Sequence, residues 1–134
     1  MVLVGDDITL PCHVKPASDA VDVMVEWSRP DLQPRFVHLR RSGEDRLIDQ
    51  NPSYKGRTSV SIDGLKQGDL SLRLSKVKFS DEGTYRCFAP DLDTDSTVHL
   101  VVGKWTHILN MFFIIFGRIF LKATHLLSLY SLVL

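Results

Sequence analysis

The chain has 134 residues, enough for one domain with one hydrophobic core. Its formal net charge is zero, from 16 Lys and Arg against 16 Asp and Glu. A protein that binds nucleic acid needs a dense basic patch to neutralise phosphates, and the basic residues here are dispersed. Composition and charge therefore argue against a nucleic-acid partner.

The two cysteines, Cys12 and Cys87, indicate a compartment. Two thiols alone cannot complete a structural zinc site, and no Cys-x-x-Cys spacing exists, so no metal site is expected. A bond between them would close a loop across most of a domain and stabilise it by about 4.5 kcal/mol in the chain-entropy account. Such a bond persists on the secretory route or at the cell surface. The alternative is a pair of buried free thiols in a cytosolic protein.

Before Gly103, apolar and polar residues alternate in short runs separated by turn residues, which is typical of strands with one buried face. In chain order, strands are expected over residues 8–14, 23–27, 36–41, 58–62, 70–74, 85–87 and 98–102. Residues 41–44 are expected to form a hairpin turn, because Gly43 tolerates positive φ. No helical periodicity competes before Gly103, so an all-β domain is predicted.

Three residues near the cysteines suggest the type of β-sandwich. Trp27 follows Cys12 by fifteen residues and points inward on its strand, so its ring can cover a disulfide. Tyr85 precedes Cys87 by two residues and faces the same side. Its hydroxyl can hydrogen-bond to the backbone near Asp81, an arrangement known as a tyrosine corner.

Two further residues support the same interpretation. Arg57 precedes a strand at the base of the sandwich and is the natural bidentate partner of Asp81. Gly83 permits the tight bend before Tyr85. The stretch between Trp27 and Arg57 is long enough for two additional strands. The pattern therefore predicts an immunoglobulin V-type sandwich, a Greek key of two antiparallel sheets.

Longer motifs carry a family resemblance. Residues 4–12 (VGDDITLPC), 25–29 (VEWSR) and 49–58 (DQNPSYKGRT) resemble the N-terminal V domain of butyrophilins and myelin oligodendrocyte glycoprotein. The similarity continues through 68–72 and 80–87 and covers residues 2–103. The resemblance implies a protein on the external face of the plasma membrane that binds a signalling receptor and regulates T-cell receptor signalling and cytokine production. A homophilic, myelin-type adhesion domain is the alternative.

The outward side of the sheet that carries Trp27 is the candidate binding surface. By alternation it carries Met24, Glu26, Phe36, His38, Arg40, Arg86, Phe88 and His99. Aromatic and arginine residues together are typical of interface cores. We therefore expect these residues, apart from Met24 and His99, to bind a protein on another cell or a second copy. The alternative is that neighbouring loops merely cover Phe36 and Phe88.

The sequence contains no recognisable catalytic motif. The five histidines are scattered, and none stands in a nucleophile elbow, a His-Glu-x-x-His pair or a glycine-rich phosphate loop. Asp91, Asp93 and Asp95 alternate in one loop, but they lack the glycine and distal glutamate of an EF-hand and are interpreted as solvated charges. A binding module is predicted, with no enzymatic activity, cofactor, metal or small-molecule substrate.

The composition changes after Gly103, where an expected V domain over 1–103 gives way to a hydrophobic, helical tail over 104–134. A helix over about 108–129 is long enough to cross a bilayer, although Arg118 and Lys122 near its middle would each cost about 2.5–3.5 kcal/mol. An interfacial amphipathic helix is a second interpretation. Translated intron is a third, because a splice-donor consensus would encode the Gly-Lys-Trp at 103–105. At the other end, the first strand is expected to be short, because Val2 already lies within it.

Overall fold

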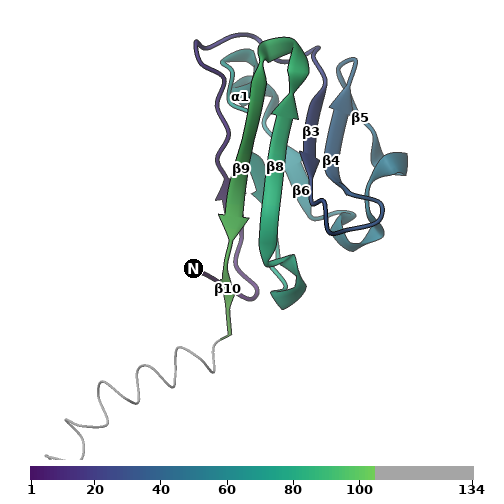
Figure 1. The fold of residues 1–134 in the computed structure, drawn as a ribbon, viewed down its shortest axis with the longest axis vertical. Coiled ribbons are helices and arrows are strands. Elements are labelled where there is room, and N and C mark those ends of the chain that lie inside the picture. The colour runs from purple at the N-terminus through teal and green to yellow at the C-terminus, as the bar shows by residue number, and fades with distance from the viewer. Residues whose placement is uncertain (105–134) are drawn as a thin grey trace, which may run out of the picture. The chain divides into compact units, whose positions relative to one another are not determined.

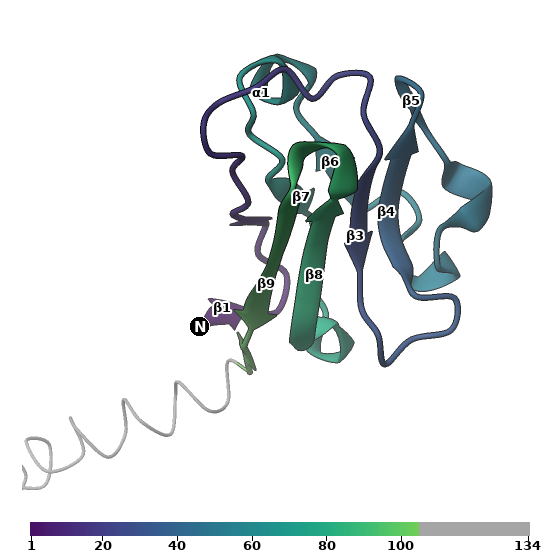
Figure 2. The same cartoon turned by 45° about the horizontal axis from the view of Figure 1, so that its top comes forward.

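Two antiparallel β-sheets form the body of the domain, beside a small two-stranded sheet, in a computed structural model of the chain, which describes residues 1–104 (Figure 1). One sheet has the strand order β5-β4-β3-β8-β9 and the other β2-β7-β6, while β1 pairs with β10. The strands are β1 (Val2–Leu3), β2 (Ile8–Leu10), β3 (Val25–Ser28), β4 (Phe36–Arg41), β5 (Glu44–Asp45), β6 (Thr58–Val60), β7 (Leu72–Leu74), β8 (Gly83–Ala89), β9 (Thr94–Leu100) and β10 (Val102–Gly103). Figure 2 shows β6 and β7 behind β8 and β9, as two layers. The predicted all-β sandwich is confirmed.

Short helical turns connect several strands. They are η1 (Leu47–Asp49), η2 (Pro52–Tyr54), α1 (Ile62–Lys66), η3 (Phe79–Asp81) and η4 (Pro90–Leu92). The prediction of a strand reaching Ile62 was wrong, because β6 ends at Val60 and α1 follows. The Ser61 hydroxyl oxygen accepts a hydrogen bond from the backbone N–H of Gly64 at 3.1 Å. This cap satisfies a free donor of the first helical turn, which favours a helix over continued alternation.

The predicted hairpin turn joins β4 to β5. Ser42 and Gly43 both have positive φ, at 52° and 76°. Two central residues with positive φ give a turn whose twist matches that of the flanking strands. The turn therefore sets the register of β5 on β4, with Arg41 opposite Glu44.

The core lies between the sheets, around Trp27 and the disulfide. The bond between Cys12, just after β2, and Cys87 on β8 joins one sheet to the other. Trp27 lies opposite Cys87 in the pairing of β3 with β8 and is fully buried. Its indole N–H donates to the Leu70 carbonyl oxygen at 2.8 Å, which satisfies the one polar group of the ring. The predicted disulfide is confirmed, and Trp27 lies beside it.

The predicted contacts of Asp81 are present at the base of the sandwich. Arg57 donates from Nη1 and Nη2 to the two carboxylate oxygens of Asp81, each at 2.8 Å. The hydrogen bond to Asp81 raises the pKa of the Arg57 guanidinium. The Tyr85 hydroxyl donates to the Asp81 carbonyl oxygen, which completes the tyrosine corner. The ion pair is bidentate and almost fully shielded from water, so it stabilises more than an exposed pair.

The interpretations of the C-terminal tail concern residues outside the described part of the chain. These are the span over about 108–129, the interfacial helix and the translated intron. Among residues 1–104, no helix is both long and apolar enough to cross a membrane. The division of the chain at Gly103 stays a prediction.

The Arg57–Asp81 pair gives a stability prediction. Asp81→Asn removes the negative charge and leaves a buried guanidinium unpaired, so we expect the free energy of unfolding to fall by about 3–5 kcal/mol. Urea unfolding of the intact, oxidised chain measures the change. The control is Asp63→Asn, at a side chain 95% exposed, which should stay within about 0.5 kcal/mol. Equal effects of the two substitutions would contradict a stabilising role for the pair.

Candidate functional site

Strand pairing defines the outward surface of the five-stranded sheet. Because Trp27 points into the core, its neighbours Glu26 and Ser28 point outward. On β8, Phe88 lies opposite Glu26 and Arg86 lies opposite Ser28. The same pairing extends over β4 and β9. The surface, called the front face below, consists of Glu26, Ser28, Arg35, Phe36, Leu39, Arg86, Phe88 and Asp95.

An arginine stacked on an aromatic ring occupies the β8–β9 side of the front face. The Arg86 guanidinium lies 4.3 Å from the centroid of the Phe88 ring. It also donates two hydrogen bonds to Asp95, from Nε to Oδ1 at 2.8 Å and from Nη2 to Oδ2 at 2.7 Å. These bonds hold the pKa of Asp95 below its usual range and raise that of Arg86. Both charged side chains are about half-exposed, so an approaching protein can reach them.

A second arginine–aromatic stack lies toward β4. The Arg35 guanidinium lies 5.0 Å from the centroid of the Phe36 ring, and its Nε donates to Glu26 Oε1 at 3.1 Å. The Glu26 side chain is only 6% exposed, whereas that of Arg35 is 57% exposed. A carboxylate that is nearly desolvated therefore lies within the front face, with its cationic partner at the solvent boundary. Burying such a charge is costly unless it is paired.

Two predicted members of this surface point elsewhere. We expected His38 and Arg40 to be exposed beside Phe36, and that prediction was wrong. The pairing of β3 with β4 has an irregularity between Trp27 and Ser28, which leaves Val37 as an extra residue on β4. A bulge of this kind reverses the alternation that follows it. His38 consequently lies opposite Trp27, on the inward side of the sheet.

The side chains of His38 and Arg40 join elements at the edge of the sandwich. His38 Nδ1 lies 2.9 Å from Thr58 Oγ1 on β6, and His38 Nε2 lies 3.0 Å from Asp45 Oδ1 on β5. Arg40 Nη2 donates to the Gly43 carbonyl oxygen at 2.8 Å. The two residues are only 3% and 7% exposed. They fix the β4–β5 hairpin in place and so support one edge of the front face. Glu26 faces outward as expected, but neighbouring side chains cover it.

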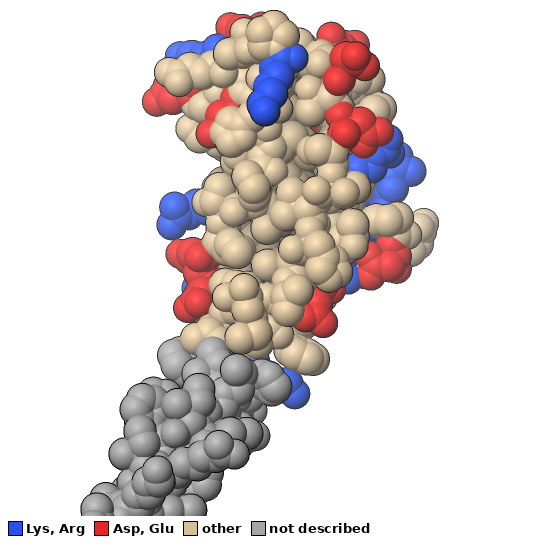
Figure 3. All heavy atoms as spheres, turned by 60° about the vertical axis from the view of Figure 1, so that its left-hand side comes forward, with Lys and Arg blue, Asp and Glu red and all other residues tan. Residues whose placement is uncertain are grey.

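Charges away from the front face are dispersed. On the side of the molecule seen in Figure 3, acidic and basic residues surround a broad uncharged middle. Asp91 and Asp93 are exposed, while Asp95 is engaged by Arg86. Within residues 1–104, no three His, Cys, Asp or Glu side chains are grouped closely enough to hold a metal ion.

Sequence reasoning missed Arg35, Leu39 and Asp95 on the front face. Asp95 lies opposite Phe88 and diagonal to Arg86, so its contact depends on the pairing of β8 with β9. The sequence signal that could have predicted this contact is the run of aspartates that follows the arginine-bearing strand β8. Leu39 was missed because the bulge reverses the alternation, so that Leu39 points outward and its neighbours point inward.

Two buried residues of the base were also missed. Arg29 Nη1 donates to the Tyr54 hydroxyl at 2.8 Å, and that hydroxyl lies 2.8 Å from the Tyr85 hydroxyl. Burial, together with the Tyr54 hydrogen bond, raises the pKa of Tyr85. A Cβ on Gly83 would lie 3.0 Å from Arg29 Nη2. The close approach of Arg29 is therefore a second reason for glycine at this position, beside the bend.

The two sheets, the disulfide between them, the buried tryptophan and the tyrosine corner define a V-type immunoglobulin domain. The chain belongs to the immunoglobulin V-set domain family, whose family model matches residues 1–103.

Individual relatives agree with the motif resemblance. Myelin-oligodendrocyte glycoprotein of Homo sapiens is 45% identical over 89 residues, 66% of this chain and 36% of that protein. This chain thus spans about a third of that relative's length. The crystal structure of bovine butyrophilin matches with a TM-score of 0.69 and 33% identity, over 77% of this chain and 49% of that one. A chain of the crystal structure of ICOS in complex with ICOS-L and an anti ICOS-L VNAR domain matches with a TM-score of 0.62 and 27% identity, over 77% of this chain and 52% of that one.

The Arg86–Asp95 pair gives a titration prediction. In Arg86→Gln the pKa of Asp95 should rise toward its ordinary value, because the guanidinium that favours the carboxylate is gone. The carboxyl carbon shift of Asp95, followed by NMR over pH, reports this change. A pKa depressed by folding contributes stability above the unfolded-state pKa, and that contribution is lost as pH falls through the folded value. Arg46→Gln is the control, and identical Asp95 titrations in both variants would mean that the pair does not form in solution.

Proposed function

We propose that this domain is an extracellular binding module that acts by protein–protein contact through the front face. The observation that carries the proposal is the pair of arginine–aromatic stacks, Arg86 on Phe88 and Arg35 on Phe36, around the shielded carboxylate of Glu26. Arginine and aromatic side chains dominate the energetic centres of protein interfaces. The stacks also hold both guanidinium groups in place, which lowers the entropy lost on binding.

Location at the outer face of the plasma membrane is part of the proposal. The Cys12–Cys87 bond supports an oxidising compartment, because cytosolic reductants keep such thiols reduced. A domain over 1–103 followed by a membrane-attached segment over 104–134 would place the front face outside the cell.

A protein on another cell is the proposed partner. Similarity to butyrophilin, and to a chain from the ICOS and ICOS-L complex, supports a receptor–ligand contact of this kind. The finer proposal is that the contact regulates T-cell receptor signalling and cytokine production. The half-exposed charges of Arg86 and Asp95 would speed and orient the encounter.

Homophilic adhesion is the second candidate, and the charge balance of the front face favours it. Arg35 and Arg86 are matched by Glu26 and Asp95 on the same surface. A two-fold interface brings one patch against its own copy, so each patch must carry both members of every complementary pair. The front face meets that condition.

Substitutions on the front face test the binding surface. Phe88→Ala and Arg86→Ala should each weaken staining of partner-bearing immune cells by the intact, oxidised chain about thirtyfold, the effect of losing roughly 2 kcal/mol. Phe79→Ala on η3 and Lys66→Ala on α1 are matched controls away from the face and should leave staining unchanged. The proposal would be contradicted if well-folded front-face variants stained the cells as strongly as the controls do.

Self-association separates the two candidates. Beads coated with the intact chain should cluster if the domain is homophilic, and Arg86→Ala should abolish the clustering. A receptor–ligand module should instead leave the beads dispersed and stain immune cells. Clustering that survives both front-face substitutions would place self-association on another surface.

A further inference from the structure

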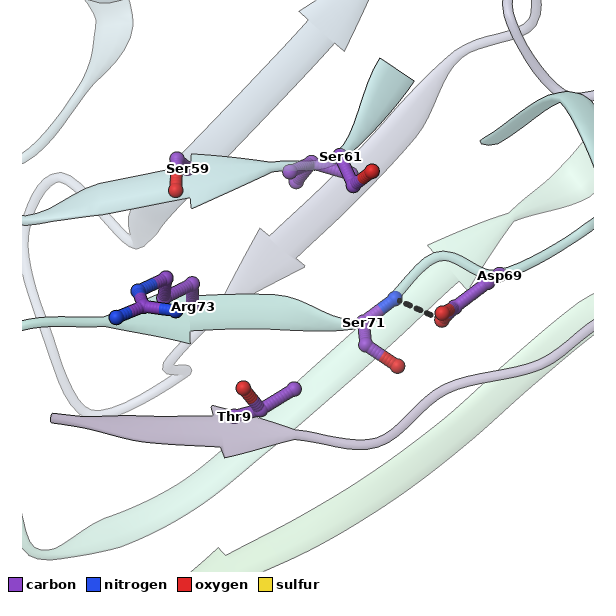
Figure 4. A pocket seen from close by; sticks show the side chains of 7 residues that line it. Thr9, Ser59, Ser61, Asp69, Ser71 and Arg73 are labelled. Carbon is purple, nitrogen blue, oxygen red and sulfur yellow. Dashed lines mark hydrogen bonds between the residues drawn. The ribbon is translucent and has the colours of Figure 1, made fainter. Parts of the chain in front are cut away.

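A shallow polar groove crosses the outward side of the three-stranded sheet, on β2, β7 and β6 (Figure 4). Its volume is about 240 Å³. Its polar lining is Thr9, Ser59, Ser61, Asp69, Ser71 and Arg73. The groove and the front face lie on different sheets, so ligand binding in the groove does not depend on the function proposed for the front face.

One end of the groove presents hydrogen-bond donors around a cation. Arg73 on the central strand β7 lies directly opposite Thr9 on β2 and Ser59 on β6, so a guanidinium stands between two hydroxyls. Within residues 1–104 neither hydroxyl is engaged in a hydrogen bond. The Arg73 side chain is 64% exposed, and its ion-pair contact with Asp7 is long, at 3.5 Å. Apart from this contact of Nη2, the N–H groups of the guanidinium are available to a ligand.

The other end presents an ionised acceptor. Asp69 Oδ1 accepts a hydrogen bond from the backbone N–H of Ser71 at 3.0 Å, drawn as the dashed line in Figure 4. Partial burial opposes ionisation, but hydrogen bonding with Ser71 outweighs it and lowers the pKa of Asp69. His13 Nε2 lies 3.4 Å from the same carboxylate. Asp69 thus keeps a negative charge at neutral pH and can accept hydrogen bonds from a ligand.

We propose that this groove binds a sugar that carries a carboxylate. A planar guanidinium matches a carboxylate with two parallel hydrogen bonds, which assigns the acid group of the ligand to Arg73. Hydroxyls both donate and accept, so Thr9 and Ser59 suit the ring oxygens and hydroxyls beside that group. Asp69 accepts from hydroxyls at the far end. The volume is below that of drug-sized sites, which fits a single sugar ring.

Other ligand classes fit the groove less well. A simple anion would use Arg73 but gain nothing from Asp69, which repels it. A chain of phosphates would meet the negative charges of Asp69 and Asp7 at either side of Arg73. A neutral sugar would leave the guanidinium with only its long contact to Asp7. Of these classes, the ligand with one acid group and several hydroxyls is the one that uses both ends.

NMR titration of the intact, oxidised chain in mild detergent tests the proposal with four probes. Methyl β-glucuronide represents acidic polysaccharide chains, and methyl α-N-acetylneuraminide represents the ends of glycoprotein glycans. Methyl β-glucoside lacks the carboxylate, and acetate lacks the hydroxyls. At least one acidic sugar should give saturable shifts of backbone amides on β2, β6 and β7. Methyl β-glucoside and acetate should bind at least about tenfold more weakly. The tighter of the two acidic sugars identifies the source of the ligand.

Substitutions assign the binding to named side chains. Arg73→Lys keeps the charge but loses the planar fork, and Thr9→Val removes one hydroxyl at nearly constant shape. Each substitution should weaken binding of the acidic sugar, and Arg73→Lys should do so by about tenfold. The matched Arg41→Lys, on the other sheet, should leave that binding unchanged. Three results would overturn the proposal: no saturable shift with either acidic sugar, acetate binding as tightly as the sugars, or equal affinities in Arg73→Lys and Arg41→Lys.

Discussion

The bond between Cys12 and Cys87 crosses the core and ties the three-stranded sheet to the five-stranded sheet. Trp27 packs beside it, opposite Cys87, and donates its N–H to a carbonyl on the far side of the core. Because side chains alternate strictly along a strand, fixing which residues face inward also fixes which face outward. A slip of one residue on β8 would bury Arg86 and Phe88 and expose the cysteine. The disulfide and Trp27 therefore determine which residues lie on each of the two outer surfaces.

A buried polar network holds the base of the same sandwich. Asp81 receives Arg57 on its carboxylate and the Tyr85 hydroxyl on its carbonyl. The Tyr85 hydroxyl contacts that of Tyr54, which accepts from Arg29. Each member satisfies a neighbour that would otherwise be left unpaired away from water, so the network stabilises as a unit. It fixes the end at which β8 begins, next to β3, and these two strands carry the centre of the front face.

Local pattern was enough to predict the parts of the fold that depend on neighbouring residues. The strand alternation, the inward side of Trp27 and the Tyr85–Asp81 contact follow from spacing between near neighbours, and the disulfide follows from the chain having only two cysteines. The strand β6 ended earlier than predicted, because the Ser61 side chain caps the helix α1 that follows. The alternation of apolar and polar residues gave no sign of this helix. At Val37 a single extra residue reversed the sides of His38, Leu39 and Arg40. Assigning sides from alternation assumes a strand without a bulge, and β4 has a bulge at this position.

The functional surfaces were harder to predict, because they join residues from separate strands. The Arg86–Asp95 contact needs the register of β8 on β9, and the hydroxyl–arginine row of the groove needs β2, β6 and β7 in register at once. Neither register is encoded in a short motif. Both follow from the core, because inward packing leaves each strand one arrangement that buries its apolar side.

The two outer surfaces differ in how their charges are used. On the front face each arginine already has a carboxylate and an aromatic ring, so the surface is preorganised and nearly neutral. Such a surface gains most from a partner large enough to exclude water around the stacks. In the groove, Arg73 and two hydroxyls are available while a carboxylate lies at the other end, which suits a small ligand with matching groups. The surfaces share no strand and connect through the core and its disulfide, so an outward substitution on one sheet leaves the geometry of the other intact, whereas a change at Trp27 would disturb both.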